Sequence, residues 1–143
     1  MYSTESPFKS ISILYRKSHM WLNNGCAGCD LTAAQALVIL IVCDFKALTQ
    51  DEITKRLSLD KSVIAKTVTK LEIAGFVRRT TNAKDKRTYD ILPTEKAWEV
   101  YPRIKEEIDQ CFLRMTQSMS EAERTEFARL LKIAAEASIA LEE

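Results

Sequence analysis

Apolar residues recur along most of this chain at the three- and four-residue spacing of an amphipathic helix. The first such stretch runs from Phe8 to Leu22, and Asn23-Asn24-Gly25 is expected to close it. A second apolar run follows Thr32, which forms a capping box with Gln35, so we expect a buried helix ending near Phe45 rather than a strand. The pattern predicts a mainly helical protein.

In the C-terminal third, the same spacing predicts two further helices. The first is expected to run from Thr94, as its cap, to about Met119, and a capping box of Ser120 and Glu123 opens the second. Together with the N-terminal helix, they present apolar faces that are too extended to be covered within one small lobe. A two-fold homodimer with intertwined terminal helices is therefore expected.

Residues 49–75 have the pattern of two short helices joined by a turn. Thr49 and Glu52 form a capping box for the first helix, and Asp60 is the expected N-cap of the second. Gly75 supplies a left-handed stop. The second helix is expected to turn three apolar side chains toward the core, namely Ile64, Val68 and Leu71.

Two strand-like segments, residues 76–79 and 88–91, follow this helix pair, and a loop of turn-forming and charged residues, 82–86, joins them. Residues 47–48 are expected to add a brief third strand. This is the pattern of a helix-turn-helix followed by a β-wing. The expected fold class is therefore mainly α with a small β-wing.

The charge of the chain is unevenly distributed, although its formal net charge is only +1. Residues 46–90 contain 11 lysines and arginines against 6 acidic residues, a net charge of +5. Residues 1–45 are neutral and residues 91–143 carry −4. A basic helix-turn-helix and wing between two less basic segments indicates a surface for nucleic acid.

The outward face of the second short helix carries small, hydroxyl and lysine side chains. Small and hydroxyl side chains let a helix approach base edges, and lysines reach phosphates. At the wing tip, basic side chains can follow the backbone or enter a narrow minor groove. The candidate residues for binding double-stranded DNA are Thr49, Lys61, Ser62, Ala65, Lys66, Thr69, Lys70, Lys84, Asp85, Lys86 and Arg87.

The wing and the segment after it resemble those of the multiple-antibiotic-resistance regulator (MarR) family of winged-helix transcription factors. The family's wing signature of Asp, any residue, Arg is met by Asp85-Lys86-Arg87. Its V-x-L-T-x-K-G segment is met by residues 91–97, except that Pro93 replaces a leucine and Ala97 a glycine. The resemblance implies that Arg87 inserts into the minor groove and that Asp85 steadies it.

The resemblance covers nearly the whole chain and implies a single domain over residues 1–143. A winged-helix lobe is expected at residues 31–92, with dimerisation helices at 8–22 and 94–142. The expected function is that of a homodimeric regulator, a repressor on a pseudo-palindromic operator, released by a small molecule or an oxidant. A winged-helix module that binds protein instead of DNA is the alternative.

Effector pockets in this family lie where the dimerisation helices meet the DNA-binding lobe. Aromatic residues at that junction are therefore candidates for lining a pocket, and ordinary core packing is the alternative. These residues are Tyr15, His19, Trp21, Trp98 and Tyr101. The sequence shows no Ser/His/Asp arrangement and no phosphate-cradling glycine loop, and its carboxylates lie on charged helix faces, so we expect neither an enzyme nor a cofactor.

Cys26 and Cys29 form a CxxC motif with three interpretations: two ordinary thiols, a redox pair, or half of a metal site. A zinc site needs about four ligands, and His19 and Asp30 are the nearest further candidates. Because so few potential ligands lie near the motif, no metal site is expected. The chain shows no signal peptide, and its longest apolar run is too short to cross a bilayer, so we expect a cytoplasmic protein with reduced thiols and no membrane partner.

Overall fold

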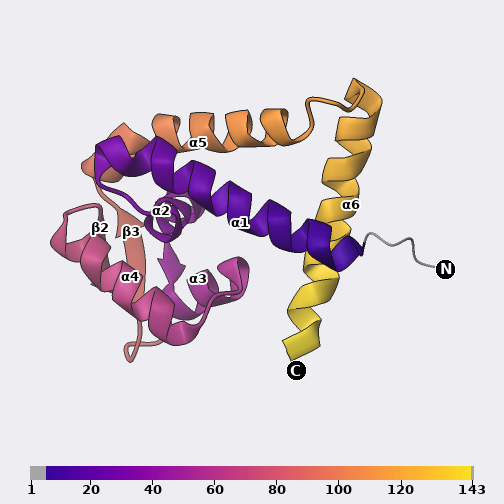
Figure 1. Ribbon diagram of the computed structural model, residues 1–143. Coiled ribbons are helices and arrows are strands. Elements are labelled where there is room, and N and C mark those ends of the chain that lie inside the picture. The colour runs from indigo at the N-terminus through magenta and orange to yellow at the C-terminus, as the bar shows by residue number, and fades with distance from the viewer. Residues whose placement is uncertain (1–5, 143) are drawn as a thin grey trace. The chain divides into compact units, whose positions relative to one another are not determined.

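The computed structural model describes residues 6–142, which form two compact units that divide between Ile108 and Asp109. Each unit is described by itself below. Both are built mostly of helices, and the first also contains a three-stranded sheet (Figure 1). The expected fold class is confirmed. The organisation of residues 1–143 as a single domain stays a prediction.

Helix α1, Pro7–Cys26, begins at Ser6, whose hydroxyl accepts a hydrogen bond from the Phe8 N–H group. It continues four residues beyond its predicted end at Leu22 and passes into a short 3₁₀ helix, η1, Ala27–Cys29. The prediction that Gly25 helps to close the helix was wrong. Gly25 lies inside α1, where a Cβ atom would collide with the Glu107 side chain, so the glycine permits close packing rather than a turn.

Helix α2, Ala33–Phe45, forms the centre of the first unit. Its capping box is present, because the Thr32 and Gln35 side chains each bond to the other's backbone N–H. The Asn23 side chain of α1 also accepts a hydrogen bond from the Ala33 N–H group. The predicted buried helix is thus confirmed, and five of its apolar side chains are at most 1% exposed, namely Ala36, Val38, Ile39, Val42 and Cys43.

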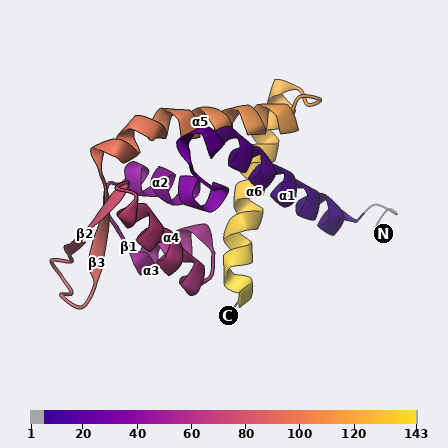
Figure 2. The ribbon, with the colours of Figure 1, turned by 60° about the vertical axis from the view of Figure 1, so that its left-hand side comes forward.

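The sheet consists of β1, Leu48–Thr49, β2, Val77–Thr81, and β3, Tyr89–Pro93, in the order β1-β3-β2. Both pairings are antiparallel, with Leu48 opposite Ile91 and Arg79 also opposite Ile91. All three predicted strands exist, each displaced by one or two residues toward the C-terminus. The β2–β3 hairpin projects from the helices of the first unit (Figure 2).

Helix α5, Glu95–Met115, crosses the boundary between the two units. Within the first unit it lies beside α1 (Figure 1): the Trp21 indole donates to the Glu107 carbonyl at 3.0 Å, and the Arg103 guanidinium donates to the Gly25 carbonyl at 3.2 Å. The predicted start at Thr94 is correct to one residue, but the predicted end at Met119 was four residues too late.

The second unit contains the end of α5 and helix α6, Glu121–Ile139, followed by a 3₁₀ helix, η2, Ala140–Glu142. Directly after α5 lies Thr116, which is fully buried. Its hydroxyl donates a hydrogen bond to the Phe112 carbonyl and accepts one from the Arg124 Nε at 2.8 Å. The Ser120 capping box is present as predicted. No described side chain of α6 is buried.

Within residues 6–142, no single helix is both long and apolar enough to cross a bilayer; α1–η1 and α2 reach that length and hydropathy only as a pair bent by 79°.

Candidate nucleic-acid interface

The helix-turn-helix consists of α3, Gln50–Leu57, and α4, Lys61–Ile73. Thr49 and Glu52 cap the start of α3 reciprocally, as predicted. The turn between the helices is closed by Ser58, which is left-handed with φ 52°. Asp60 occupies the N-cap position of α4 as predicted, but its side chain makes no capping hydrogen bond, so only its extended backbone opens the helix.

Helix α4 has one buried face and one open face. The predicted inward residues are buried at 0–1% exposure. Thr67 is also buried, at 8% exposure, and its hydroxyl donates to the Val63 carbonyl. On the open face, Ala65 is half-buried and the other candidates are exposed. The small side chain at position 65 leaves room for close approach to a groove floor. The exposed candidates are Lys61, Ser62, Lys66, Thr69 and Lys70.

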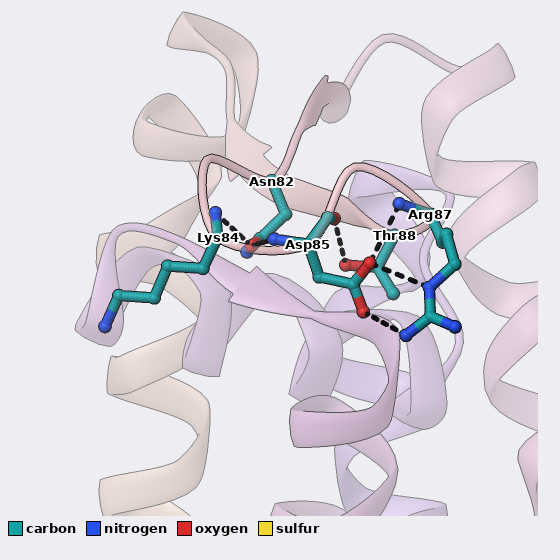
Figure 3. Close-up of polar contacts among 5 residues, drawn as sticks. All are labelled: Asn82, Lys84, Asp85, Arg87 and Thr88. Carbon is teal, nitrogen blue, oxygen red and sulfur yellow. Dashed lines mark hydrogen bonds and ion pairs between the residues drawn. The ribbon is translucent and has the colours of Figure 1, made fainter.

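The wing tip holds a charge pair of fixed geometry (Figure 3). Arg87 Nε lies 3.0 Å from Asp85 Oδ1, a terminal Arg87 nitrogen lies 3.1 Å from Asp85 Oδ2, and the Arg87 N–H group also donates to Oδ1 at 3.0 Å. These bonds hold the pKa of the Asp85 carboxyl below its usual value and raise the pKa of the Arg87 guanidinium. Because the Arg87 side chain is 89% exposed, its remaining N–H groups face solvent.

Asn82 organises this wing, although the sequence identified it only as a turn former. Its Oδ1 accepts hydrogen bonds from the N–H groups of Lys84 and Asp85 at 2.9 and 2.8 Å. Its Nδ2 donates to Asp90 Oδ1 on β3 at 2.8 Å. Thr88 closes the loop by donating to the Asp85 carbonyl. The sequence signal for this turn is an asparagine whose side chain can accept hydrogen bonds from the backbone N–H groups two and three residues later.

The wing lysines have a simpler environment than Arg87. Lys84 and Lys86 are both exposed. Figure 3 shows the Lys84 side chain extending away from the Asp85–Arg87 pair, while its backbone N–H group bonds to Asn82. Both cations are therefore unneutralised by any carboxylate among the described residues, as a contact with phosphate requires.

Arg79, on β2, was not among the predicted residues. Its Nε lies 3.2 Å from Glu72 Oε1, and a terminal nitrogen lies 3.4 Å from Thr69 Oγ1. The side chain therefore ties the wing to the last two turns of α4. No local pattern in the sequence could identify this contact, because register in the sheet determines which strand residue faces α4.

A hollow of about 260 Å³ lies beside α4, between the start of α3 and the sheet. Two candidates, Thr49 and Lys61, line it. Thr49 is half-buried and its hydroxyl is occupied in the capping box, whereas Lys61 Nζ lies 3.9 Å from Asp51 Oδ1 across an exposed pair. The remaining lining residues are Gln50, Asp51, Arg79, Thr88, Tyr89 and Ile91.

The five aromatic candidates for an effector pocket fall into separate contacts. Tyr15 and His19 form a tilted ring pair within α1 with centroids 4.3 Å apart, and Trp98 and Tyr101 form another within α5 at 5.4 Å. Trp21 instead joins α1 to α5 through its N–H group. Tyr15 and Trp98 are exposed in the chain, so ordinary core packing does not describe these two.

Tyr101 also connects α5 to the end of α2. Its hydroxyl donates to the Asp44 carboxylate, and this bond, with burial and the Asp44 charge, raises the pKa of Tyr101 to about 12. The phenol is therefore a neutral donor at physiological pH. Among the described contacts, none joins the Tyr15–His19 pair to the Trp98–Tyr101 pair.

The CxxC motif lies at the junction of α1 and η1, and both thiols are free. Cys26 is fully buried and Cys29 is half-buried. Burial, followed by the neighbouring Cys29 and Glu107, raises the pKa of the Cys26 thiol, which Arg103 only partly offsets. Cys26 is thus a poor nucleophile. No group of three or more potential metal ligands is assembled within residues 6–142.

The arrangement of a two-helix unit, an open polar helix face and a β-hairpin with a basic tip defines a winged helix-turn-helix protein. Residues 30–88 match the model of the MarR family. YybA of Bacillus subtilis, an uncharacterized HTH-type transcriptional regulator, is 28% identical over 78 residues, which are 54% of this chain and 52% of YybA. The matched segments cover only 34% to 56% of the lengths of the curated relatives.

Solved structures match over nearly the full chain. The transcriptional regulator SlyA is 26% identical, with a TM-score of 0.88 over 95% of this chain and 96% of SlyA. A MarR family transcriptional regulator from Listeria monocytogenes, complexed with a 26mer DNA, is 20% identical, with a TM-score of 0.89 over 96% of this chain and 91% of that one. The chain is therefore similar to MarR family regulators, in sequence over the winged-helix segment and in fold over nearly its whole length. The relatives named here are transcriptional regulators rather than enzymes.

Proposed function

We propose that this chain is a sequence-specific, DNA-binding transcriptional regulator. The observation that carries the proposal is that one compact unit presents both the open face of α4 and the fixed Asp85–Arg87 pair at the wing tip. A protein of the same fold was crystallised in complex with a 26mer DNA, which supports the same use of these two elements here.

In the proposed complex, α4 lies in the major groove. Ser62, Ala65 and Thr69 approach base edges because their side chains are short, and Lys66 and Lys70 reach the phosphates on either side. Arg87 enters the adjacent minor groove with its guanidinium already oriented by Asp85. A narrow minor groove concentrates negative potential and favours such a cation.

The functional form is proposed to be a homodimer. Helix α6 has no buried side chain within the chain, yet it carries several exposed large apolar residues. A second copy that covered them would also supply a second α4, and two-fold symmetry then calls for a pseudo-palindromic operator with half-sites about one helical turn apart. The apolar residues concerned are Leu130, Leu131, Ile133 and Ile139.

Regulation is proposed to follow from a change in the separation of the two α4 helices. A ligand releases DNA only if it binds more tightly to the arrangement that mismatches the half-sites. The aromatic pairs on α1 and α5 are the candidate contacts for a small effector. Cys29 is the more accessible of the two CxxC thiols for an oxidant. The proposed role is that of a repressor in the cytoplasm.

Selection of bound duplexes from a random pool, followed by anisotropy titration of the enriched sequence, tests the proposal. The expected result is a pseudo-palindromic site that the protein binds at least a thousandfold more tightly than random duplex, within the range typical of specific regulators. Repeating the selection with reduced and peroxide-treated protein tests the oxidant response. Equal affinity for enriched and random duplex at every salt concentration would refute the proposal.

A further inference from the structure

The C-terminal end of α4 is closed first by the residues that directly follow it and then by residues at the start of α5. Three N–H groups after the helix bond back into its last turn: Ala74 to the Lys70 carbonyl at 3.0 Å, Gly75 to Glu72 at 3.0 Å and Phe76 to Leu71 at 2.8 Å. Gly75, with φ 85°, makes the left-handed turn that this pattern requires. The carbonyls of residues 74–76 are not used by this pattern and accept hydrogen bonds from elsewhere in the chain.

Those hydrogen bonds come from the start of α5, about twenty residues later in the chain. Lys96 Nζ lies 2.6 Å from the Ala74 carbonyl oxygen and 4.4 Å from the centre of the Phe76 ring. Thr94 Oγ1 lies 2.6 Å from the Gly75 carbonyl and 3.1 Å from that of Phe76, which also accepts from the Thr94 N–H group at 3.0 Å. Thr94 was predicted to cap its own helix, but its hydroxyl serves α4 instead.

The hydrogen bonds from Thr94 and Lys96 to the carbonyls of residues 74–76 form a cap, and a positively charged side chain is especially favourable at this place. The last carbonyls of a helix carry partial negative charge, so the Lys96 ammonium interacts with the end of α4 as well as with one oxygen. Phe76 is only 4% exposed and its ring face attracts the same ammonium. The carbonyls of residues 74–76 are thus bonded from one short segment, which contacts the chain directly after the last turn of α4.

The last turn of α4 leads directly into the residues proposed to meet DNA. Thr69 and Lys70 lie at its start, and Arg79 holds Thr69 and Glu72 from the wing side. The end of α4 is therefore fixed from two directions, by β2 on one side and by Thr94 and Lys96 on the other. A rotation of the start of α5 has to move these capping groups relative to α4.

We infer that Lys96 and Thr94 are positioning residues of the DNA interface, which set the orientation of α4 without touching DNA. The inference rests on the proposed DNA-binding function. It assigns the coupling between α5 and α4 to specific atoms: the Lys96 Nζ–Ala74 O and Thr94 Oγ1–Gly75 O hydrogen bonds. Specific binding requires that orientation, whereas non-specific binding to phosphates tolerates a looser helix.

The test compares Lys96→Met, which keeps the aliphatic stem, with Lys96→Arg, which can still donate to the Ala74 carbonyl. Lys17→Met is the control, because Lys17 is exposed on α1 and has no partner among the described residues. Anisotropy titrations give the affinity for the selected duplex and for random duplex across salt concentrations. We expect Lys96→Met to lose roughly tenfold in specific affinity, equivalent to about 1.4 kcal/mol, with random-duplex affinity and salt slope unchanged, and Lys96→Arg to recover it.

A smaller salt slope in Lys96→Met, by about 0.9, with equal losses on both duplexes would identify a direct phosphate contact and overturn the inference. Unchanged specific affinity would overturn it as well. Thr94→Val and Thr94→Ser provide a second pair, with loss expected only for valine. Hydrogen exchange without DNA should quicken at residues 74–76 in Lys96→Met and Thr94→Val. If the natural chain binds no duplex specifically, the proposed function fails, whereas the exchange result still reports on the cap.

Discussion

Asn82→Ala removes the side chain that organises the wing and leaves the basic residues of the wing in place. The asparagine makes three hydrogen bonds, two from its Oδ1 to the N–H groups of Lys84 and Asp85 and one from its Nδ2 to Asp90. Without them, the loop loses its internal support and the Asp85 carboxylate is no longer fixed relative to β3. We therefore expect a wing that is less ordered before it meets DNA.

The magnitude follows from these three bonds. A hydrogen bond contributes a net 0.5–1.5 kcal/mol in typical cases, and the two partners in the loop are near solvent, so roughly 1–2 kcal/mol of wing stability depends on Asn82. If binding requires the ordered wing, the complex must recover this free energy. The expected loss of operator affinity is then about five- to thirtyfold, since each 1.4 kcal/mol corresponds to about tenfold.

Anisotropy titration against the selected duplex measures this loss, and thermal unfolding reports stability in parallel. Thr81→Ala is the matched control, because Thr81 is an exposed residue of the same hairpin whose side chain has no hydrogen bond among those described. Asn82→Asp should also weaken binding, since it places a second carboxylate against Asp90, and the exchange Asn82→Asp with Asp90→Asn should restore it. Full affinity in Asn82→Ala would refute the argument that the wing must be ordered in advance.

Three other predictions concern charge and thiol chemistry. Arg87→Ala should weaken operator binding roughly tenfold or more by titration, and Arg87→Lys should recover only part of it, because lysine lacks the planar fork. Arg87 lowers the pKa of Asp85 in the folded protein below the pKa of an aspartate in the unfolded chain. The ion pair therefore stabilises the fold at pH values above the unfolded pKa, and this stabilisation is lost as the pH falls through the folded pKa. Carbon NMR should show the Asp85 midpoint below its usual range, and Arg87→Ala should raise it. In native protein treated with a thiol reagent, Cys29→Ser should slow labelling while Cys26→Ser leaves it unchanged.

Each of these has a contrary outcome. Equal binding by Arg87→Ala would remove the wing from the interface. An Asp85 midpoint that does not respond to Arg87→Ala would mean that another group stabilises the carboxylate. Rapid labelling of Cys26 would mean that the junction of α1 and η1 opens readily, which would make this thiol a credible oxidant sensor.

The features that the sequence predicted well are those determined within a few residues. The capping boxes at Thr32, Thr49 and Ser120 are all formed, because both partners lie three residues apart and face each other as soon as a helix starts. Gly75 has the left-handed conformation for a similarly local reason. The buried and open faces of α4 also follow from spacing alone.

The features that it missed depend on contacts between distant segments. The cap that Thr94 provides for α4, and the bonds from Arg79 to Glu72, arise only after α5 and the sheet have packed against the end of α4. Asn82 lay within a predicted turn, but its bond to Asp90 needs the β2–β3 register. Helix ends at Cys26 and Met115 were misplaced because the packing of neighbouring elements, rather than the local signal, determined them.

Glycines 25 and 28 look alike in the sequence, but they differ in the space around them and therefore in their tolerance to substitution. Any side chain at Gly25 displaces Glu107, which is mostly buried and pairs with Arg103 at 3.0 Å, whereas nothing lies within 4 Å of a Cβ atom placed at Gly28. A saturation library screened for folded protein should therefore be depleted at position 25, where Glu107 has to move, relative to position 28. Two sites three residues apart thus differ in their freedom to vary during evolution.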